Sequence, residues 1–203
     1  LYPSVTTDSI TAEAFPDLIA SFSTSFASSN ANRATNVILA TARFNGKVIM
    51  PGEKLSFNST VGKRTPARGY KEAAVYVNGE TSTDYGGGIC QVSSTLYNAT
   101  LRANLGISDR SNHMFTVGYV PIGTDATVSW GAPDFVFKNT RNYPIKIVAT
   151  SSGRIVNFKI YGLKEDADYD IEVKSTKTGT IPFKTTYTTD PTLPKGTEKI
   201  IQK

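Results

Sequence analysis

The spacing of hydrophobic and polar side chains predicts two different elements in the first part of the chain. Residues 20–26 alternate with a period of two, which is typical of a half-buried strand, although two phenylalanines four residues apart also allow a helix. Residues 32–44 carry apolar side chains at helical spacing and precede Asn45-Gly46, a common helix stop. We therefore expect a helix over residues 32–44.

The next segment predicts short strands joined by turns. Pro51-Gly52 marks a turn, residues 54–58 a short strand, and residues 59–70 a loop rich in glycine, proline and arginine. Residues 73–77 form a further strand, and Asn78-Gly79 directly after them is the strongest hairpin signal in the chain.

The clearest helix signal begins at Cys90 and runs to about Leu105. Its apolar side chains, at i, i+4, i+7 and i+11, form a single stripe of Val92, Leu96, Ala99 and Ala103. Arg102 in the last turn complements the helix dipole, and we expect Gly106 to cap the end.

The remainder of the main body predicts strands separated by glycine, proline and asparagine turns. The expected strands are 113–120, 125–130, 134–138, 143–150 and 154–161. Together these elements predict an α+β fold, in which about two helices pack on an antiparallel sheet.

Changes in composition divide the chain into three parts. Residues 1–16 are polar and rich in turn formers, and they are expected to be a lead-in segment. Residues 17–166 hold the predicted helices and most strands. Residues 167–203 follow a charged stretch, are rich in threonine, and alternate in short runs, so we expect a partial all-β module there.

Composition and charge exclude several classes of protein. The 203 residues are 39% hydrophobic and 19% charged, which is enough to build a core, and no apolar run is long enough for a transmembrane segment. The net charge of +5 is scattered, whereas a nucleic-acid binder usually concentrates its basic residues on one element. A weak positive field suits an anionic polymer such as a cell wall better.

Cys90 is the most informative residue for chemistry. It is the only cysteine, so an intrachain disulfide is excluded, and a zinc site would lack ligands with suitable spacing. The triple glycine Gly86-Gly87-Gly88 precedes it, and a helix follows. A thiol at a helix N-terminus meets free N–H groups and the positive end of the dipole, which favour the nucleophilic thiolate.

The only histidine, His113, can supply the base that a thiol nucleophile needs, and Asp125 follows where an orienting carboxylate is expected. The order of helix-start cysteine, strand histidine and next-strand aspartate is that of transglutaminase and papain-like cores. The alternatives stay open: a lone cysteine after glycines is often a buried structural residue, and Asp125 can simply bond to its own turn.

Other side chains near the glycine turn are candidates for substrate binding, with no metal or cofactor expected. Backbone N–H groups at this turn could form an oxyanion hole, and tyrosines flanking Cys90 could line a groove. The candidates for binding are Gly87, Gly88, Gln91, Tyr85 and Tyr97. The carboxylates Glu72 and Asp84 are an alternative acid–base pair for cleaving a sugar bond.

Several of these segments resemble the VanW family over roughly residues 17–162. The matching stretches are Pro51 to Asn58, Val61-Gly62, Gly69-Tyr70, Gly86 to Ala99, Gly123 to Val128, and Arg110 with His113 as Arg-x-x-His. Residues 180–202 are similar to the start of an extracellular G-five domain. The resemblance implies a cell-surface protein of a Gram-positive bacterium, near peptidoglycan, from a family that accompanies some vancomycin-resistance clusters.

Three functions fit these observations. The first is a cysteine peptidase, amidase or transpeptidase acting on the peptide part of peptidoglycan through Cys90, His113 and Asp125. The second is a non-catalytic module that binds peptidoglycan, in which the thiol is structural. The third is a glycan-cleaving enzyme that uses Glu72 or Asp84.

Overall fold

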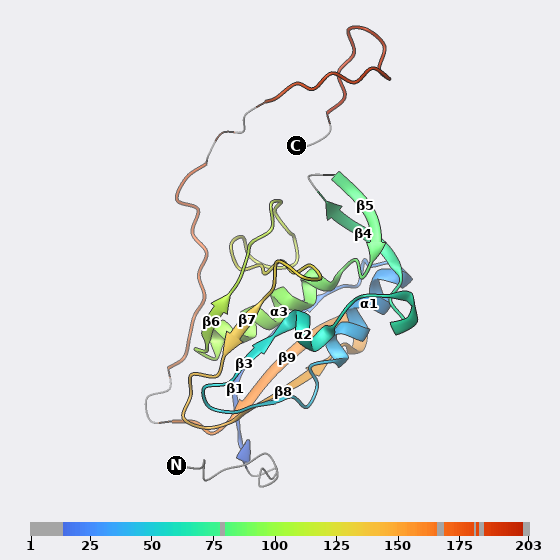
Figure 1. The fold of residues 1–203 in the computed structure, drawn as a ribbon. Helices are drawn as coiled ribbons and strands as arrows, with labels where there is room; N and C mark the ends of the chain where they lie inside the picture. Colours follow the sequence, from blue (N-terminus) through green and yellow to red (C-terminus); the bar gives the residue numbers. More distant parts are fainter. Residues whose placement is uncertain (1–13, 78–79, 166–168, 181, 183–184, 201–203) are drawn as a thin grey trace.

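The computed structural model describes residues 14–77, 80–165, 169–180, 182 and 185–200, and it shows an α+β fold (Figure 1). The helices are α1 (Ala31–Ala42), α2 (Phe57–Val61) and α3 (Ile89–Arg102), with short 3₁₀ turns at Pro66–Arg68 and Ser152–Arg154. The strands are β1 (Asp17–Ser25), β2 (Val48–Ile49), β3 (Lys54–Ser56), β4 (Glu72–Val77), β5 (Glu80–Tyr85), β6 (Gly106–Asp109), β7 (Val136–Lys138), β8 (Ile145–Thr150) and β9 (Ile155–Gly162).

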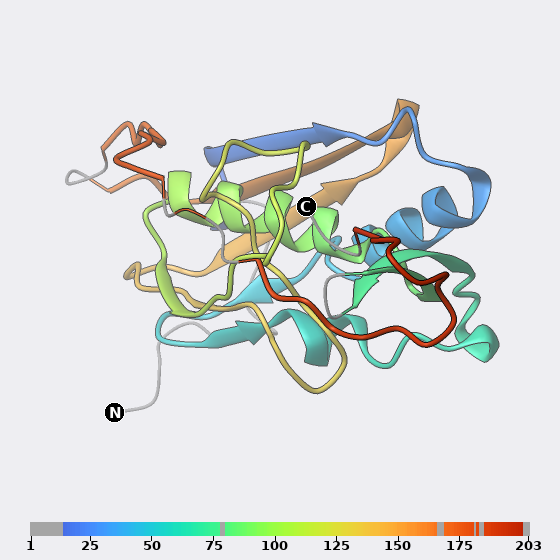
Figure 2. The same cartoon turned by 90° about the horizontal axis from the view of Figure 1, so that it is seen from above.

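All strand pairs of the described residues are antiparallel, and they form three sheets. The first has the order β1-β9-β8-β2, the second β3-β7-β6, and the third is the β4–β5 hairpin. Seen from above, α3 lies between the first sheet and the second (Figure 2). The hairpin projects from the body beside the end of α3 that carries Cys90 (Figure 1).

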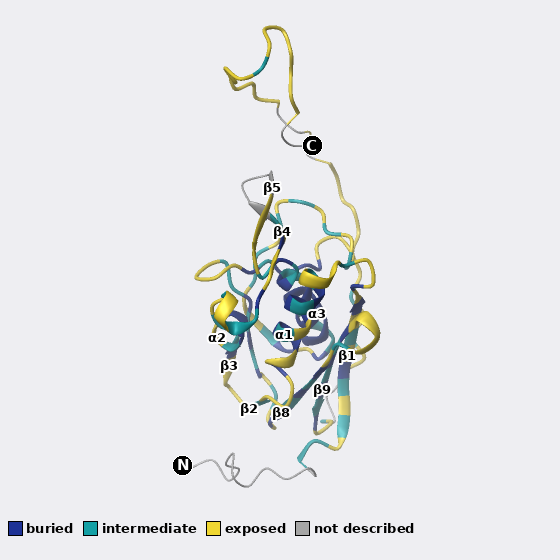
Figure 3. Cartoon of the chain, turned by 90° about the vertical axis from the view of Figure 1, so that its right-hand side faces the viewer, coloured by how far each residue is buried: buried dark blue, intermediate teal, exposed yellow. Residues whose placement is uncertain are grey.

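The hydrophobic core fills the space around α3 and α1. Phe44, just after α1, contacts Phe57 of α2 at a ring-centroid distance of 5.0 Å and Phe158 of β9 at 5.7 Å, so it joins three elements. All four members of the predicted apolar stripe on α3 are buried. Figure 3 shows α3 as one of the most deeply buried elements.

The polar face of α3 is buried as well, which its amphipathic pattern does not predict. Its polar side chains bond to neighbouring elements, as a buried polar group must. Thr95 pairs with Thr24 of β1 at 2.8 Å, Ser93 donates to the carbonyl of Ala126 at 2.6 Å, and Asn98 donates to that of Thr124 at 2.7 Å. These bonds fix the backbone on both sides of Asp125 against the helix.

Most predictions for the first half of the chain are confirmed within a few residues. The exception is the segment 54–70: the strand expected at 54–58 ends at Ser56, and the helix α2 occupies residues 57–61, because the Ser56 hydroxyl caps a helix there by accepting from the Ser59 N–H. The strand expected at 20–26 is β1, and the helix expected at 32–44 is α1. The hairpin is formed by β4 and β5, while its turn at Asn78-Gly79 lies outside the described residues. The Cys90 helix is α3, but it ends at Arg102, because Asn104 adopts a positive φ of 53°; Gly106 begins β6 and does not cap the helix.

Two of the strands expected in the second half are wrong. Residues 113–120 contain no strand, and residues 125–130 contain only an isolated bridge between Ser111 and Thr127. Part of the reason is that side chains take up the backbone groups that a strand would use. The carbonyls of residues 124–126 accept from Asn98, Arg110 and Ser93, and the N–H of His113 donates to the carboxylate of Asp125. The strands expected at 134–138, 143–150 and 154–161 correspond to β7, β8 and β9.

The described residues of 169–200 contain neither helix nor strand, so the short strands expected in 167–203 are not formed in that part. Strands need hydrogen-bonded partners, and this segment runs as an extended chain beyond the body (Figure 1). None of the helices in the described ranges has the length and hydropathy needed to cross a membrane.

Candidate active site

The turn before Cys90 is too crowded for any residue larger than glycine at position 87. A Cβ atom at Gly87 would lie 2.6 Å from the carbonyl oxygen of Ala74 and 2.7 Å from that of Ala73, both backbone atoms of β4. Gly88 caps α3 with a φ of 101°, a conformation that glycine adopts readily. The turn is also tied to α1, because the buried amide of Asn36 donates to the carbonyls of Gly87 and Lys71.

Cys90 is the second residue of α3, and its side chain is partly buried against the segment 127–128. The Val128 N–H points at the sulfur at 3.5 Å, and the Val128 carbonyl lies 3.3 Å away. The Thr127 hydroxyl is more distant, at 3.9 Å. Within the described part of the chain the backbone N–H of Cys90 has no acceptor, so it can donate to a substrate oxygen.

His113 is fixed by Asp125 through two hydrogen bonds. The backbone N–H and the ring nitrogen Nδ1 of His113 both lie 2.6 Å from Oδ2 of Asp125. With Nδ1 held by the carboxylate, Nε2 is the ring nitrogen left for the thiol. The His113 side chain lowers the pKa of the Cys90 thiol, and both residues line the same cavity.

The three groups shift one another toward the charged forms. Burial opposes ionisation of Cys90, but the hydrogen bond and the charge of His113, with the Val128 N–H, outweigh it and lower the thiol pKa. Burial opposes the charge of His113 too, but the bonds to Cys90 and Asp125 raise its pKa. Burial likewise opposes the charge of Asp125, while the His113 bonds hold its pKa below the ordinary value. A thiolate–imidazolium pair is therefore favoured.

Arg110 is a member of this network that reasoning from side-chain chemistry missed. Its Nε donates to the backbone carbonyl of Asp125 at 2.7 Å, and Nη2 lies 3.3 Å from Oδ1 and 2.9 Å from the carbonyl of Gly123. Its guanidinium also lies over the ring of Tyr97, 5.2 Å from the centroid. The sequence signal for it is its place in the Arg-x-x-His stretch that ends at His113.

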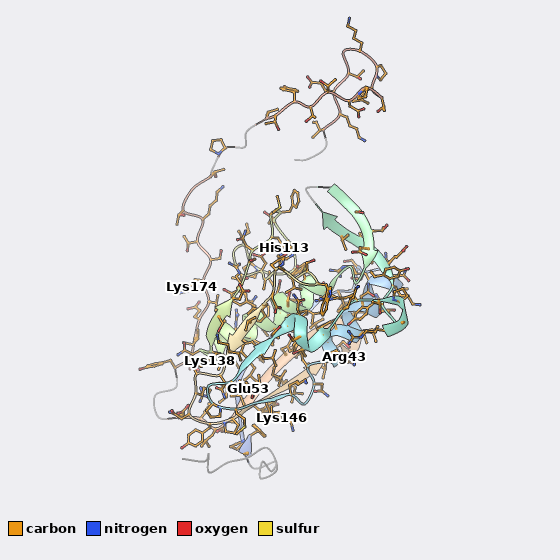
Figure 4. The ribbon with its side chains drawn as sticks, viewed as in Figure 1. Arg43, Glu53, His113, Lys138, Lys146 and Lys174 are labelled. Carbon is orange, nitrogen blue, oxygen red and sulfur yellow. The ribbon has the colours of Figure 1, made fainter. Side chains whose placement is uncertain are left out.

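Cys90 and His113 lie in the wall of a cavity of about 940 Å³, a volume suited to an extended ligand. The β4–β5 hairpin, the glycine turn and the loop 111–133 enclose it, and three of its hydrophobic side chains are exposed. These are Met114, Trp130 and Tyr85, exposed by 81%, 52% and 37%. His113 lies at the end of the body from which the hairpin projects (Figure 4).

The residues predicted to bind substrate separate into two groups. Gly87, Gly88 and Tyr85 line the large cavity with Cys90. Gln91 borders it, but its amide is committed elsewhere, since Nε2 donates to the Thr24 hydroxyl and the Ser25 carbonyl. Tyr97 is not among the lining residues, because its ring packs edge-on against Phe135, 5.5 Å away.

Glu72 and Asp84 do not form a facing carboxylate pair. In the register of the hairpin Glu72 is opposite Tyr85, whereas Asp84 is opposite Ala73. Cross-strand partners share a face and successive residues alternate, so the two carboxylates belong to opposite faces of the hairpin. Asp84 borders the large cavity and Glu72 does not. Their arrangement does not support the sugar-cleaving alternative.

Histidine, cysteine and carboxylate side chains could hold a metal ion where three or more of them converge. No such group occurs among the residues that the structure describes.

Comparison with known proteins gives two family matches. Residues 32–161 match the model of the VanW-like proteins, and residues 172–203 match that of the G5 domain. The chain is 45% identical to the uncharacterized protein YoaR of Bacillus subtilis over 79% of its own length and 53% of that protein. It is 31% identical to the vancomycin B-type resistance protein VanW of Enterococcus faecalis, over 66% and 50%. The chain thus spans about half the length of these relatives, and no solved structure matches it.

Proposed function

This chain belongs to the VanW-like family, and we propose that its VanW-like domain is a cysteine-dependent acyl transferase acting on the peptides of peptidoglycan. Cys90 is the nucleophile, His113 transfers protons, and Asp125 orients His113. The observation that carries the proposal is that Cys90 and His113 line the same large cavity, where His113 lowers the pKa of the thiol and is itself held through Nδ1 by the Asp125 carboxylate. The order of these residues is the one found in transglutaminase and papain-like enzymes.

The geometry supports a two-step reaction. The Cys90 thiolate attacks the carbonyl carbon of an amide, and the developing oxyanion accepts a hydrogen bond from the Cys90 N–H. The His113 imidazolium gives its proton to the departing amine, which leaves an acyl thioester on Cys90. Water or a second amine then attacks the thioester while His113 takes up its proton. This releases the acid or a new amide and restores the thiolate of Cys90 and the imidazolium of His113.

The choice of peptidoglycan rests on the kind of proteins to which the chain is related. The name of the Enterococcus relative refers to vancomycin resistance, and vancomycin acts on cell-wall synthesis. The G5 match adds a module associated with cell walls, and the net charge of +5 suits an anionic polymer. We propose that the protein is extracellular, at the surface of a Gram-positive bacterium.

Incubation with purified peptidoglycan, followed by mass spectrometry of the released and cross-linked peptides, tests this function. The native chain should produce new peptide termini or new cross-links, whereas Cys90→Ser and Cys90→Ala should lower the rate by several orders of magnitude and keep the fold. Glu72→Gln and Asp84→Asn serve as controls and should retain activity. Full activity of Cys90→Ser would overturn the proposal.

The second candidate is a peptidoglycan-binding module without catalysis. It is favoured by the exposed Trp130, Tyr85 and Met114 at the large cavity, which could contact a ligand without any reaction. If the native chain and the cysteine variants bind peptidoglycan equally and none changes it, this second function is correct.

A further inference from the structure

A second, smaller cavity adjoins the one that contains Cys90. It has a volume of about 400 Å³ and is lined by the loop between β1 and α1, the start of α3, and residues 118–119. Arg33, Gln91 and Tyr119 line both cavities, so they form the wall between them. Gln91 directly follows Cys90 in the chain, which places this wall next to the nucleophile.

We propose that the small cavity binds a carboxylate of the substrate peptide and that Arg33 is the residue that holds it. The inference rests on the proposed function, because it names the chemical group by which a peptide would be placed across Cys90. Neither the VanW-like match nor the relatives' names assign a ligand to this cavity. The remaining observations concern its charge and the fixed position of Arg33.

The small cavity is polar and carries one sign of charge. Among the described residues that line it, Arg33 is the only one with a formal charge, and the hydroxyls of Ser25, Ser28 and Ser29 supply further donors. The backbone of the loop between β1 and α1 is held by Arg154, whose guanidinium donates to the carbonyl of Ser29 at 2.8 Å. Hydroxyls and a guanidinium are the groups that bind a carboxylate in proteins.

Tyr119 does not offset this positive charge. Burial, together with the nearby Cys90, raises the pKa of its phenol, so the side chain is neutral at physiological pH. The first turn of α1, where Arg33 lies, contains no acidic side chain either. An anion entering the small cavity therefore meets attraction from Arg33 and no carboxylate among its lining residues.

The position of Arg33 is tied to the nucleophile turn. Its guanidinium donates to the Ser29 hydroxyl at 2.5 Å and to Oε1 of Gln91 at 2.9 Å. A Cβ atom at Gly88 would lie 2.7 Å from Cγ of Arg33, so the absence of a side chain at Gly88 is what lets the arginine stem pack there. A carboxylate bound by Arg33 would thus be held at a fixed position relative to Cys90, which lies two residues after Gly88.

Paired peptides that differ only in a carboxylate test the proposal. Each carboxylate of a peptidoglycan-type stem peptide is converted in turn to a carboxamide, and binding of every peptide to the 203-residue Cys90→Ser chain is measured by calorimetry. At least one amide should bind about tenfold or more weakly than the free acid, since hydrogen bonds to charged groups are worth roughly 1.5–3 kcal/mol. The difference should shrink at high salt.

Arginine variants show whether Arg33 is responsible. In the same Cys90→Ser background, Arg33→Gln should abolish the preference for acid over amide, and Arg33→Lys should keep part of it. Arg43→Gln is the matched control: Arg43 lies at the other end of α1, lines neither cavity, and should leave the preference intact. Circular dichroism checks that each variant is folded.

The outcomes separate this inference from the proposed function. Equal binding of all acids and amides by the Cys90→Ser chain overturns the carboxylate site, even if the native chain turns peptides over. A clear preference for the acid, lost in Arg33→Gln, supports the site even if the native chain shows no turnover, in which case the proposed catalysis fails alone. An acid preference that survives in Arg33→Gln also overturns the assignment to Arg33.

Discussion

Asp125 holds His113 by one carboxylate oxygen and Arg110 by the other. Oδ2 lies 2.6 Å from both the backbone N–H and Nδ1 of His113, while Oδ1 lies 3.3 Å from Nη2 of Arg110. Every one of these partners is a donor, so the site requires an acceptor at both oxygen positions. Only an ionised carboxylate provides two such acceptors.

The substitution Asp125→Asn should therefore disable the site without unfolding the domain. An amide has one oxygen, so either His113 or Arg110 would face an NH₂ group. We expect turnover to fall by about 10²–10⁴-fold, as for other triads that lose the orienting carboxylate. The measurement is peptide turnover beside the melting temperature, with the exposed Asp109→Asn as the control. Unchanged turnover in Asp125→Asn would remove Asp125 from the mechanism.

The reactivity of Cys90 should depend on pH in a way set by His113. Because the pKa of Cys90 is lowered and that of His113 is raised, the thiolate should appear below about pH 8.5, the usual thiol value, while His113 stays protonated to higher pH than a free imidazole. The rate of alkylation by iodoacetamide should rise with pH through this lowered pKa and then level off.

His113→Ala removes the imidazolium and should move the midpoint of this curve to higher pH, since burial of the thiol is then less opposed. A midpoint near the usual thiol value in the native chain, unchanged in His113→Ala, would mean that Cys90 is not an activated nucleophile.

Arg110 should act as a positioning residue. Lysine cannot reach the Asp125 carboxylate and two carbonyls together, so Arg110→Lys should loosen Asp125 and reduce turnover by up to about 10²-fold. It should also shift the midpoint of the alkylation rate against pH to a higher pH. A residue that only stabilises the fold would leave that midpoint unchanged. Arg43→Lys is the matched control, because Arg43 lies at the C-terminal end of α1 and lines neither cavity.

Gly87 should not tolerate even one methyl group. In Gly87→Ala the new Cβ would meet the carbonyl oxygens of Ala73 and Ala74 below 3 Å, and backbone atoms cannot rotate away. We expect a loss of about 1–3 kcal/mol in the free energy of unfolding, measured by urea denaturation. Gly118→Ala, where a Cβ has no atom within 4 Å, should stay near the native value. Equal stability of the two variants would contradict the crowded turn.

The sequence predicts those parts of this fold that repeat with a regular period. The stripe from Val92 to Ala103 identifies α3, and the triple glycine before it places Cys90 at the helix start. The order of the only cysteine, the only histidine and Asp125 suggests a site, and the structure brings these three side chains together. Their catalytic role stays a prediction.

What the sequence could not predict depends on bonds between distant residues. The segment 113–130 alternates like strands, yet within it the carbonyls of residues 124–126 bond to Asn98, Arg110 and Ser93, and no periodic pattern reveals such partners. The buried polar face of α3 was missed for the same reason: a serine or asparagine appears exposed until its partner is known. Arg33 gave no signal because its significance comes from the cavity wall it shares with Gln91.

Removal of residues 167–203 should leave the main body nearly as stable as the full chain. No side chain in the described part of this segment is buried, and the bond from the Ser175 hydroxyl to the carbonyl of Ile122 is the hydrogen bond that joins this part to the body. The contacts that close the body, including the pair of Arg141 and Glu165, lie before residue 167. We expect the melting temperature of 1–166 to differ by less than about ten degrees from that of the full chain.

A truncation after Leu163 is the control. It should lower the melting temperature more, because it also removes Glu165, which pairs with Arg141. If removing 167–203 alone lowers the melting temperature by ten degrees or more, the division into two modules is wrong.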